Sequence, residues 1–218
     1  MIYIFDLDDT LYDERQYVES GLRAVSVFAE KAWGVDKKKG FADLVALIDT
    51  NGRGHVFNDF LSMHHIAANK KNVSKCVSAY RLHKPSIFVP DEHLNLLNKL
   101  PKPLYLVTDG NKIVQSNKVN ALGVTDYFKR IFITHRFGIK HSKPSTYCFK
   151  KIKQLEQCEW NQMTYIGDNP AKDFVNLNKL GMTTIRVLTG VHRMVKADPG
   201  FDAKFTIQSL RELTSLTL

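Results

Sequence analysis

The first part of the chain has one short apolar run followed by a long stretch of helical periodicity. Residues 1–5 are apolar and rich in β-forming side chains, which predicts a buried strand. From about residue 13 to residue 33, apolar side chains recur every three or four positions, which predicts an amphipathic helix that ends at Gly34. The same spacing continues to Pro85, so residues 13–85 are expected to be all-helical. The further helices in this stretch are predicted at residues 41–48, 57–65 and 73–82.

The remainder of the chain alternates short apolar runs with helical segments. Such alternation implies right-handed crossover connections and a parallel sheet. Strands are predicted at residues 104–107, 131–133, 163–166 and 183–187, with a weak last strand around Phe205. Helices are predicted up to Gly123, at 146–155, at 170–180 and after Ser209. The predicted fold class is α/β: a Rossmann-like parallel core of residues 1–12 and 86–218, with a helical domain of residues 13–85 inserted after the first strand.

Composition narrows the class of protein. The 218 residues suggest one domain, or one carrying an insertion, and 44% hydrophobic with 24% charged residues is ordinary for a globular chain. No apolar run approaches the roughly 20 residues of a membrane helix, and Asp6 interrupts the first apolar stretch, where a signal peptide needs continuous apolarity. The three cysteines form no CxxC pair. We therefore expect a cytoplasmic protein with no membrane partner.

The net charge of +9 indicates attraction to an anion. The lysine runs are short and far apart, and no motif that reads a nucleic-acid groove accompanies them. Nucleic-acid binding is therefore not expected. A small phosphorylated metabolite is one partner that would fit the charge, and an ordinary solvated basic surface is the open alternative. We expect the chain to be a monomer or a weak homodimer.

Unusual polar groups follow several of the predicted strands. Because ligands of an open parallel sheet bind beyond the carboxyl ends of its strands, these groups should lie close together. Clustered carboxylates are costly without a cation, and oxygen ligands from Asp suit Mg²⁺. A turn or helix-capping role explains Asp109 and Asp13 well, but it explains Asp6 and Asp8 poorly because they leave a buried strand two residues apart. The polar segments are Asp6-Leu-Asp-Asp-Thr10, Thr108-Asp-Gly-Asn111, Lys143-Pro-Ser145 and Gly167-Asp-Asn-Pro-Ala-Lys-Asp173.

Thr108 and Gly110 indicate a phosphate-binding turn. A small hydroxyl and a glycine turn at a helix N-terminus offer backbone N–H groups and the positive end of the helix dipole. Such turns are common in loops, so Thr108 and Gly110 alone are weak evidence of phosphate binding. The three other polar segments strengthen this interpretation.

Together these segments resemble the haloacid dehalogenase-like (HAD) phosphohydrolases. Asp6-Leu-Asp-Asp-Thr10 is similar to their DxDxT signature, and Thr108, Lys143 and Gly167-Asp-x-x-x-x-Asp173 are similar to their second, third and fourth motifs. The match keeps the family's order and spans residues 1–187. The helical insertion resembles the C1-type cap of this family, so the resemblance implies a HAD fold. The dehalogenases of the family lack the second Asp of DxDxT, whereas Asp8 is present here.

The resemblance implies a role for each motif residue. Asp6 is the expected nucleophile that forms an aspartyl-phosphate, and Asp8 the general acid and base. Mg²⁺ is expected on the Asp6 carboxylate, the Asp8 backbone carbonyl and Asp168. Thr10 is expected to hold the loop of Asp8, and Asp173 to support the metal or Lys143. Phosphate is expected to bind Thr108, Lys143 and the N–H groups of Asp109 and Gly110. Gln115 and Lys118, in the next helix, are interpreted as surface or structural residues.

Charge counting gives Lys143 a part in the chemical step. With Asp8 protonated, Asp6, Asp168 and a phosphate dianion exceed the charge of Mg²⁺ and Lys143 by one, and by two without Lys143. Truncation of Lys143 is therefore expected to lower turnover far more than folding stability. A solvated loop lysine is the alternative, and Lys140 is a nearby competitor for the role.

Substrate choice is expected to depend on the cap. Arg53 and His55 lie in a glycine-rich turn that could contact a polar leaving group, although an ordinary exposed turn is an open alternative. Arg15 and Tyr12 are further candidates. The histidines at 64, 65, 135 and 141 lack ligand spacing and are interpreted as structural.

The predicted function is a Mg²⁺-dependent phosphohydrolase that cleaves a small phosphomonoester, a sugar phosphate or nucleoside monophosphate, through an aspartyl-phosphate. A phosphotransferase or phosphomutase with the same nucleophile is the first alternative. A non-catalytic binding protein with this fold is the second, but it would have no need for Asp8 as an acid.

Overall fold

The computed structural model describes residues 1–216, and the chain divides into two compact units. Met1–Glu14 and the chain from Phe88 onward form one unit, here called the core unit. Arg15–Ile87 form the other, the helical unit. Among the described residues, no helix is both long and apolar enough to cross a bilayer.

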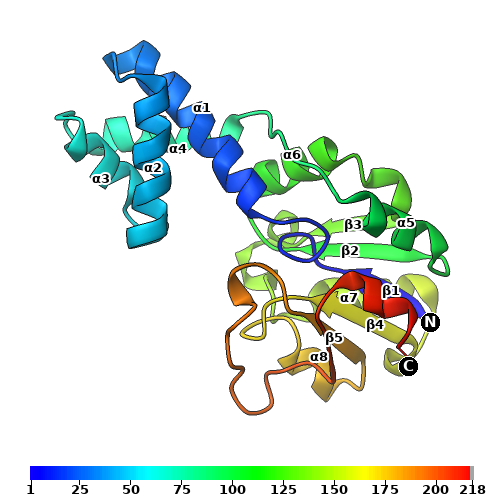
Figure 1. Ribbon diagram of the computed structural model, residues 1–218. Helices are drawn as coiled ribbons and strands as arrows, with labels where there is room; N and C mark the ends of the chain where they lie inside the picture. Colours follow the sequence, from blue (N-terminus) through cyan, green and yellow to red (C-terminus); the bar gives the residue numbers. More distant parts are fainter. Residues whose placement is uncertain (217–218) are drawn as a thin grey trace. The chain divides into compact units, whose positions relative to one another are not determined.

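The core unit is built on a six-stranded sheet in the order β3-β2-β1-β4-β5-β6 (Figure 1). Every neighbouring pair is parallel, which confirms the predicted α/β class. Phe5, the last residue of β1, is in register with Leu106 of β2 and Ile166 of β4. The loops after these three strands therefore leave the sheet at the same edge. The strands are β1 (Ile2–Phe5), β2 (Leu104–Thr108), β3 (Arg130–Ile133), β4 (Met163–Gly167), β5 (Thr183–Val187) and β6 (Phe205–Ile207).

Helices cover both faces of this sheet. In Figure 1, α5 (Asp91–Lys99) and α6 (Lys112–Leu122) lie along one face, and α8 (Val175–Lys179) lies on the other. The face of α8 carries a buried cluster that also includes residues of α7 (Tyr147–Glu156). Burial of such large apolar side chains supplies the main stabilisation, at roughly 1.5–3 kcal/mol each. The cluster includes Ile4, Tyr105, Phe132, Phe149, Tyr165 and Phe174.

Three helical expectations need correction. Helix α5 was not predicted, although Pro90 precedes it and acidic residues occupy its first turn, both ordinary start signals. The helix expected over 170–180 is only Val175–Lys179, because Asp173 bonds back to Asn169 in a turn. The last helix is a 3₁₀ segment, Leu210–Thr214.

The helical unit contains four helices, as the periodicity predicts. The apolar stripe of α1 is buried from Val18 to Ala29, and it packs with Leu44, Phe60 and Cys76 of the following helices. Gly21 allows close packing, since a Cβ there would lie 2.4 Å from the ring of Tyr80. The helices are α1 (Arg15–Trp33), α2 (Lys37–Asn51), α3 (Val56–Met63) and α4 (Lys70–Leu82).

Candidate active site

Asp6 is the first residue after β1, and it is buried at the edge of the sheet where the strands end. Its backbone N–H donates to the carbonyl of Ile166 at 2.8 Å, which extends the β1–β4 ladder by one residue. The residue is only 4% exposed. Three residues later the chain turns sharply, because Asp9 adopts the left-handed conformation with φ of 54°.

Asp9 stabilises this turn from the inside. Its carboxylate accepts from the backbone N–H groups of Glu14 at 2.9 Å and Val191 at 3.2 Å, and its carbonyl accepts from the Thr189 hydroxyl. Gly190 has φ of 58°, and a Cβ there would lie 2.0 Å from Asp9 Cγ. These contacts hold the loop of residues 6–10, here called the motif loop, against the loop after β5.

Three buried carboxylates lie close together beside the loop that follows β1. Ligand atoms of Asp6, Asp168 and Asp173 all lie within 4.8 Å of one another. Burial raises the pKa of Asp6 to about 7, with Lys143 opposing and Asp173 adding to the rise. Burial, and then the charges of Asp6 and Asp173, raise the pKa of Asp168 to about 9. Because the three carboxylates lie so close together, they could hold a cation, as the sequence predicts for Asp6 and Asp168.

Lys143 supplies one cation to this cluster. Its ammonium lies 3.0 Å from Asp6 and 2.8 Å from Asp173, and it donates to the Tyr165 hydroxyl at 2.8 Å. Burial alone would lower the pKa of Lys143, but Asp173 and Asp6 hold it well above its ordinary value. Lys140, the predicted competitor, is exposed on a 3₁₀ turn.

Asp173 is fixed by its own turn. Its second carboxylate oxygen accepts from the backbone N–H of Asn169 at 3.0 Å. Gly167 makes room for it, since a Cβ there would lie 2.5 Å from that oxygen. The arrangement fits support of Lys143, one of the two roles expected for Asp173.

The turn after β2 brings Thr108 to the same edge of the sheet. Its hydroxyl is buried and accepts from the side-chain amide of Gln115 at 2.6 Å. Asn111 caps α6 by accepting from the backbone N–H of Ile113 at 3.0 Å. Gly110 has φ of 136°, a conformation that side-chain-bearing residues rarely adopt. The turn and the helix start have the form of an anion-binding segment.

Asp109 ties this turn to two other loops. Its carboxylate accepts from the Thr134 hydroxyl at 2.6 Å and from the backbone N–H of Lys143 at 3.1 Å. The ammonium of Lys172 lies 3.5 Å away. The side chain of Asp109 is thus a loop-to-loop connector, and only its backbone N–H remains a candidate phosphate ligand.

Three side chains donate to the carboxylate of Asp8, and none of these contacts was predicted from the sequence. Its carboxylate accepts from Tyr12 at 2.7 Å, Lys118 at 2.8 Å and Gln115 at 2.9 Å. Gln115 and Lys118 were interpreted as surface or structural residues, and the surface interpretation is wrong because each is only 2% exposed. Their spacing with Val119 places them on the buried face of α6, a signal that the sequence does contain.

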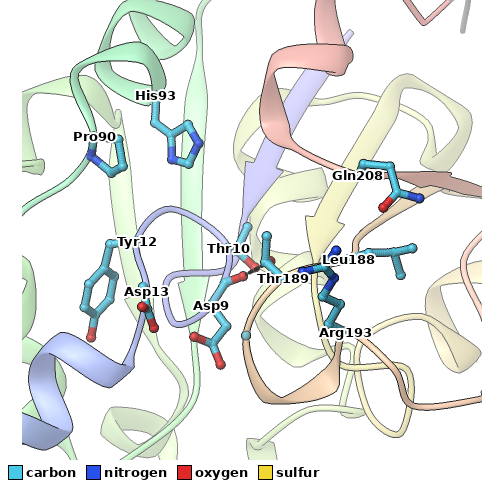
Figure 2. Close-up of a pocket in the computed structure, with 11 residues that line it drawn as sticks. Asp9, Thr10, Tyr12, Asp13, Pro90, His93, Leu188, Thr189, Arg193 and Gln208 are labelled. Carbon is cyan, nitrogen blue, oxygen red and sulfur yellow. Dashed lines mark hydrogen bonds between the residues drawn. The ribbon is translucent and has the colours of Figure 1, made fainter.

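Thr10, the last residue of the motif, is also buried. Its hydroxyl oxygen has no hydrogen-bond partner among residues 1–216. Thr10 also lines a cavity of about 490 Å³ beside the motif loop, together with Asp9, His93 and Arg193 (Figure 2). Asp6, Asp8 and Lys143 do not line this cavity.

Three of the candidate specificity residues belong to the helical unit, whereas Tyr12 belongs to the core unit, where it is buried and donates to Asp8. Arg15 opens α1 and makes ion pairs with Glu19 at 3.0 Å and Asp49 at 2.6 Å. Arg53 and His55 are exposed in the turn between α2 and α3. Their roles toward a substrate remain predictions.

Known proteins match this chain along nearly its whole length. A glyceraldehyde 3-phosphate phosphatase of Methanocaldococcus jannaschii is 29% identical over 220 residues, covering 98% of this chain and 95% of that protein. The enzyme of that name from Pyrococcus abyssi is 30% identical over 191 residues, covering 84% and 79%. The structure of YfnB from Bacillus subtilis, bound to magnesium, superposes with a TM-score of 0.68 at 20% identity, covering 98% and 96%.

The family profile described as haloacid dehalogenase-like hydrolase matches residues 3–187, which include all four polar segments. The order of motifs, the parallel sheet and this match agree. The chain belongs to the haloacid dehalogenase-like hydrolase family.

Proposed function

We propose that this protein is a Mg²⁺-dependent phosphatase that hydrolyses a small phosphate monoester through an aspartyl-phosphate on Asp6. The observation that carries the proposal is the position of Asp6. It is a buried carboxylate 3.0 Å from a buried lysine, clustered with Asp168 and Asp173, and followed two residues later by a second carboxylate.

The carboxylates fit a divalent cation. Burial, and also the charge of Asp173, raise the pKa values of both Asp6 and Asp168, and the nearby Lys143 does not reverse either rise. The donor atoms are all oxygens, the ligands that Mg²⁺ prefers. Asp6, Asp168 and the backbone carbonyl of Asp8 would hold the ion, which when bound neutralises charge on the phosphate and the nucleophile.

The proposed reaction has two steps, transfer of the phosphoryl group to Asp6 and hydrolysis of the aspartyl-phosphate. An oxygen of Asp6 attacks phosphorus, and the bond from phosphorus to the leaving oxygen breaks as Asp8 protonates that oxygen. Asp8 next takes a proton from water as the water oxygen attacks phosphorus and the bond to Asp6 breaks. Lys143 offsets the repulsion between the anionic nucleophile and the anionic phosphate. Thr108 and the N–H groups of Asp109 and Gly110 would hold the phosphate oxygens.

A short-chain sugar phosphate is the substrate class with most support. Four relatives are named glyceraldehyde 3-phosphate phosphatase, and the first of them aligns with 98% of this chain. We place triose phosphates first among the candidate substrates. The helical unit would act as the cap that reads the leaving group, with Arg15, Arg53 and His55 as its candidate contacts.

The experiment is a phosphate-release assay over triose phosphates, longer sugar phosphates, nucleoside monophosphates and an aryl phosphate. Each substrate is assayed with Mg²⁺ and with chelator. We expect metal-dependent release that is highest with a triose phosphate. A phosphotransferase would instead consume the substrate only when a sugar or methanol acceptor is added, with the phosphoryl group recovered on the acceptor and not as inorganic phosphate.

A further inference from the structure

We infer that Lys118 and Gln115 are positioning residues that hold the carboxylate of Asp8 in place for proton transfer. The inference rests on the proposed function, because it assigns Asp8 the proton transfers of a phosphatase. It follows from the contacts of two buried polar residues on α6, which none of the four motifs includes.

Lys118 is a buried cation shared by two carboxylates. Its ammonium lies 2.8 Å from Asp8 and 2.9 Å from Glu14. Its side chain is 3% exposed, whereas that of Asp8 is 22% exposed. A buried lysine is retained at a cost in desolvation, so a cation at this position indicates a specific requirement. Asp8 keeps an open side toward solvent, where a leaving group can approach.

Gln115 connects the proton-transfer residue to the phosphate turn. Its amide nitrogen lies 2.9 Å from Asp8 and 2.6 Å from the Thr108 hydroxyl, so each of its two hydrogens has an acceptor. Because Thr108 accepts this bond, its own hydroxyl proton is left to donate to a phosphate oxygen. One side chain thus sets the spacing between the bound phosphate and the acid.

The contacts also distinguish the two oxygens of Asp8. Lys118 and Tyr12 both donate to Oδ1, while Gln115 is the one side chain among residues 1–216 that donates to Oδ2. A carboxylate oxygen has two lone-pair directions, so both directions of Oδ1 are used and one direction of Oδ2 remains. The geometry points to Oδ2 as the oxygen that gives its proton to the leaving group and takes one from water.

Leaving-group dependence tests this inference. An alkyl phosphate needs protonation of its leaving oxygen, whereas an aryl phosphate with an acidic phenol leaves almost unaided. We would measure kcat/KM of the Mg²⁺-loaded enzyme for both esters in wild type, K118M and Q115M, since kcat/KM reports the steps up to cleavage. D8N gives the reference loss, and K112M is the matched control because Lys112 is exposed on the same helix.

The expected result is selective loss. K118M and Q115M should lower kcat/KM for the alkyl ester by about 100-fold and for the aryl ester by less than about 10-fold, as D8N should. K112M should match wild type with both esters. Q115M keeps every charge in place, so it remains informative if K118M fails to fold.

Two results would overturn the inference. Equal losses with both esters would make these residues merely structural, and unchanged kinetics in the folded Q115M would remove Gln115 from the positioning role. A wild-type enzyme that releases phosphate from neither ester would instead refute the proposed function itself, so the two failures are distinguishable.

Discussion

The ammonium of Lys143 lies 3.0 Å from the carboxylate of Asp6, and both side chains are almost completely buried. The same ammonium lies 2.8 Å from Asp173, so one cation serves two carboxylates. Because these side chains are buried, little water screens their charges, and the charges interact strongly with one another. Lys143 therefore stabilises the ionised form of Asp6, the proposed nucleophile.

Replacement of Lys143 by Met should lower kcat by at least about 100-fold, because it removes the cation that faces the nucleophile and the phosphate. The buried position also changes the expectation for stability. Loss of one partner leaves Asp6 and Asp173 uncompensated, which should lower the free energy of unfolding of the metal-free protein by about 3–5 kcal/mol. Urea unfolding with chelator and steady-state kinetics with Mg²⁺ would measure the two effects. K140M, at an exposed lysine, is the control and should alter neither quantity.

The stability of the metal-free protein should fall as the pH rises from about 4 to about 9. Asp6 and Asp168 have folded pKa values of about 7 and about 9, above the 3.8 of an unperturbed Asp. Over this window the unfolded chain has released protons that the folded chain still binds, so a rise in pH favours unfolding. The stability these groups contribute is complete below about pH 4 and is lost as pH passes through the folded values.

D168N should flatten this pH profile and raise the metal-free melting temperature at pH 8, since it removes one of the three carboxylates. Mg²⁺ should stabilise wild type increasingly as pH rises, because binding requires ionised ligands. Thermal melts in chelator and in Mg²⁺ across this range would measure both. A metal-free melting temperature that climbs from pH 5 to pH 8 would contradict the assignment.

Replacement of Thr108 by Val should reduce kcat/KM by about 10- to 100-fold, because it removes the hydroxyl proposed to bind the phosphate and leaves the Gln115 amide with one acceptor fewer. T108S keeps the hydroxyl and should remain close to wild type. Inorganic phosphate should also inhibit T108V more weakly than wild type. Equal kinetics for T108V and T108S would show that the hydroxyl is not used.

Replacement of Gly190 by Ala should lower the free energy of unfolding by more than replacement of Gly123 by Ala does. Both glycines have φ near 60°, so both variants carry the backbone cost of about 1 kcal/mol. At Gly190 the new Cβ would also lie 2.0 Å from Asp9 Cγ, whereas at Gly123 no atom of the described part of the chain lies within 4 Å of it. Denaturant titrations would compare the two. A cost in G190A no larger than in G123A would show that the Asp9 turn is not held by this contact.

The strands and their parallel arrangement could be predicted from local patterns in the sequence, whereas the order of the strands in the sheet could not. Short apolar runs such as Leu104–Val107 can be recognised because a strand buried on both faces is apolar at every position. The polar residues that end β1, β2 and β4 could be assigned to one edge because parallel strands align their carboxyl ends. Asp6, Asp168 and Asp173 could therefore be predicted as a cluster before any coordinates were known.

The contacts within the site depend on tertiary packing that no local pattern encodes. Lys118 lies far along the chain from Asp8 and Glu14, and a lysine on an amphipathic helix is usually solvated. Tyr165 occupies a strand position that is typical of any core residue, yet its hydroxyl accepts from Lys143. The choice of Lys143 over Lys140 likewise needed the loop conformation, because both lysines follow the same strand.

The most direct measurement is detection of a phosphoryl group on Asp6 during turnover. The enzyme would be mixed with Mg²⁺ and a triose or aryl phosphate, quenched in acid, digested and analysed by mass spectrometry, alongside a phosphate-release assay of D6N. The account predicts phosphorylation of the peptide that carries Asp6 in wild type, and loss of phosphate release in folded D6N. Phosphate release by D6N at the wild-type rate would contradict it.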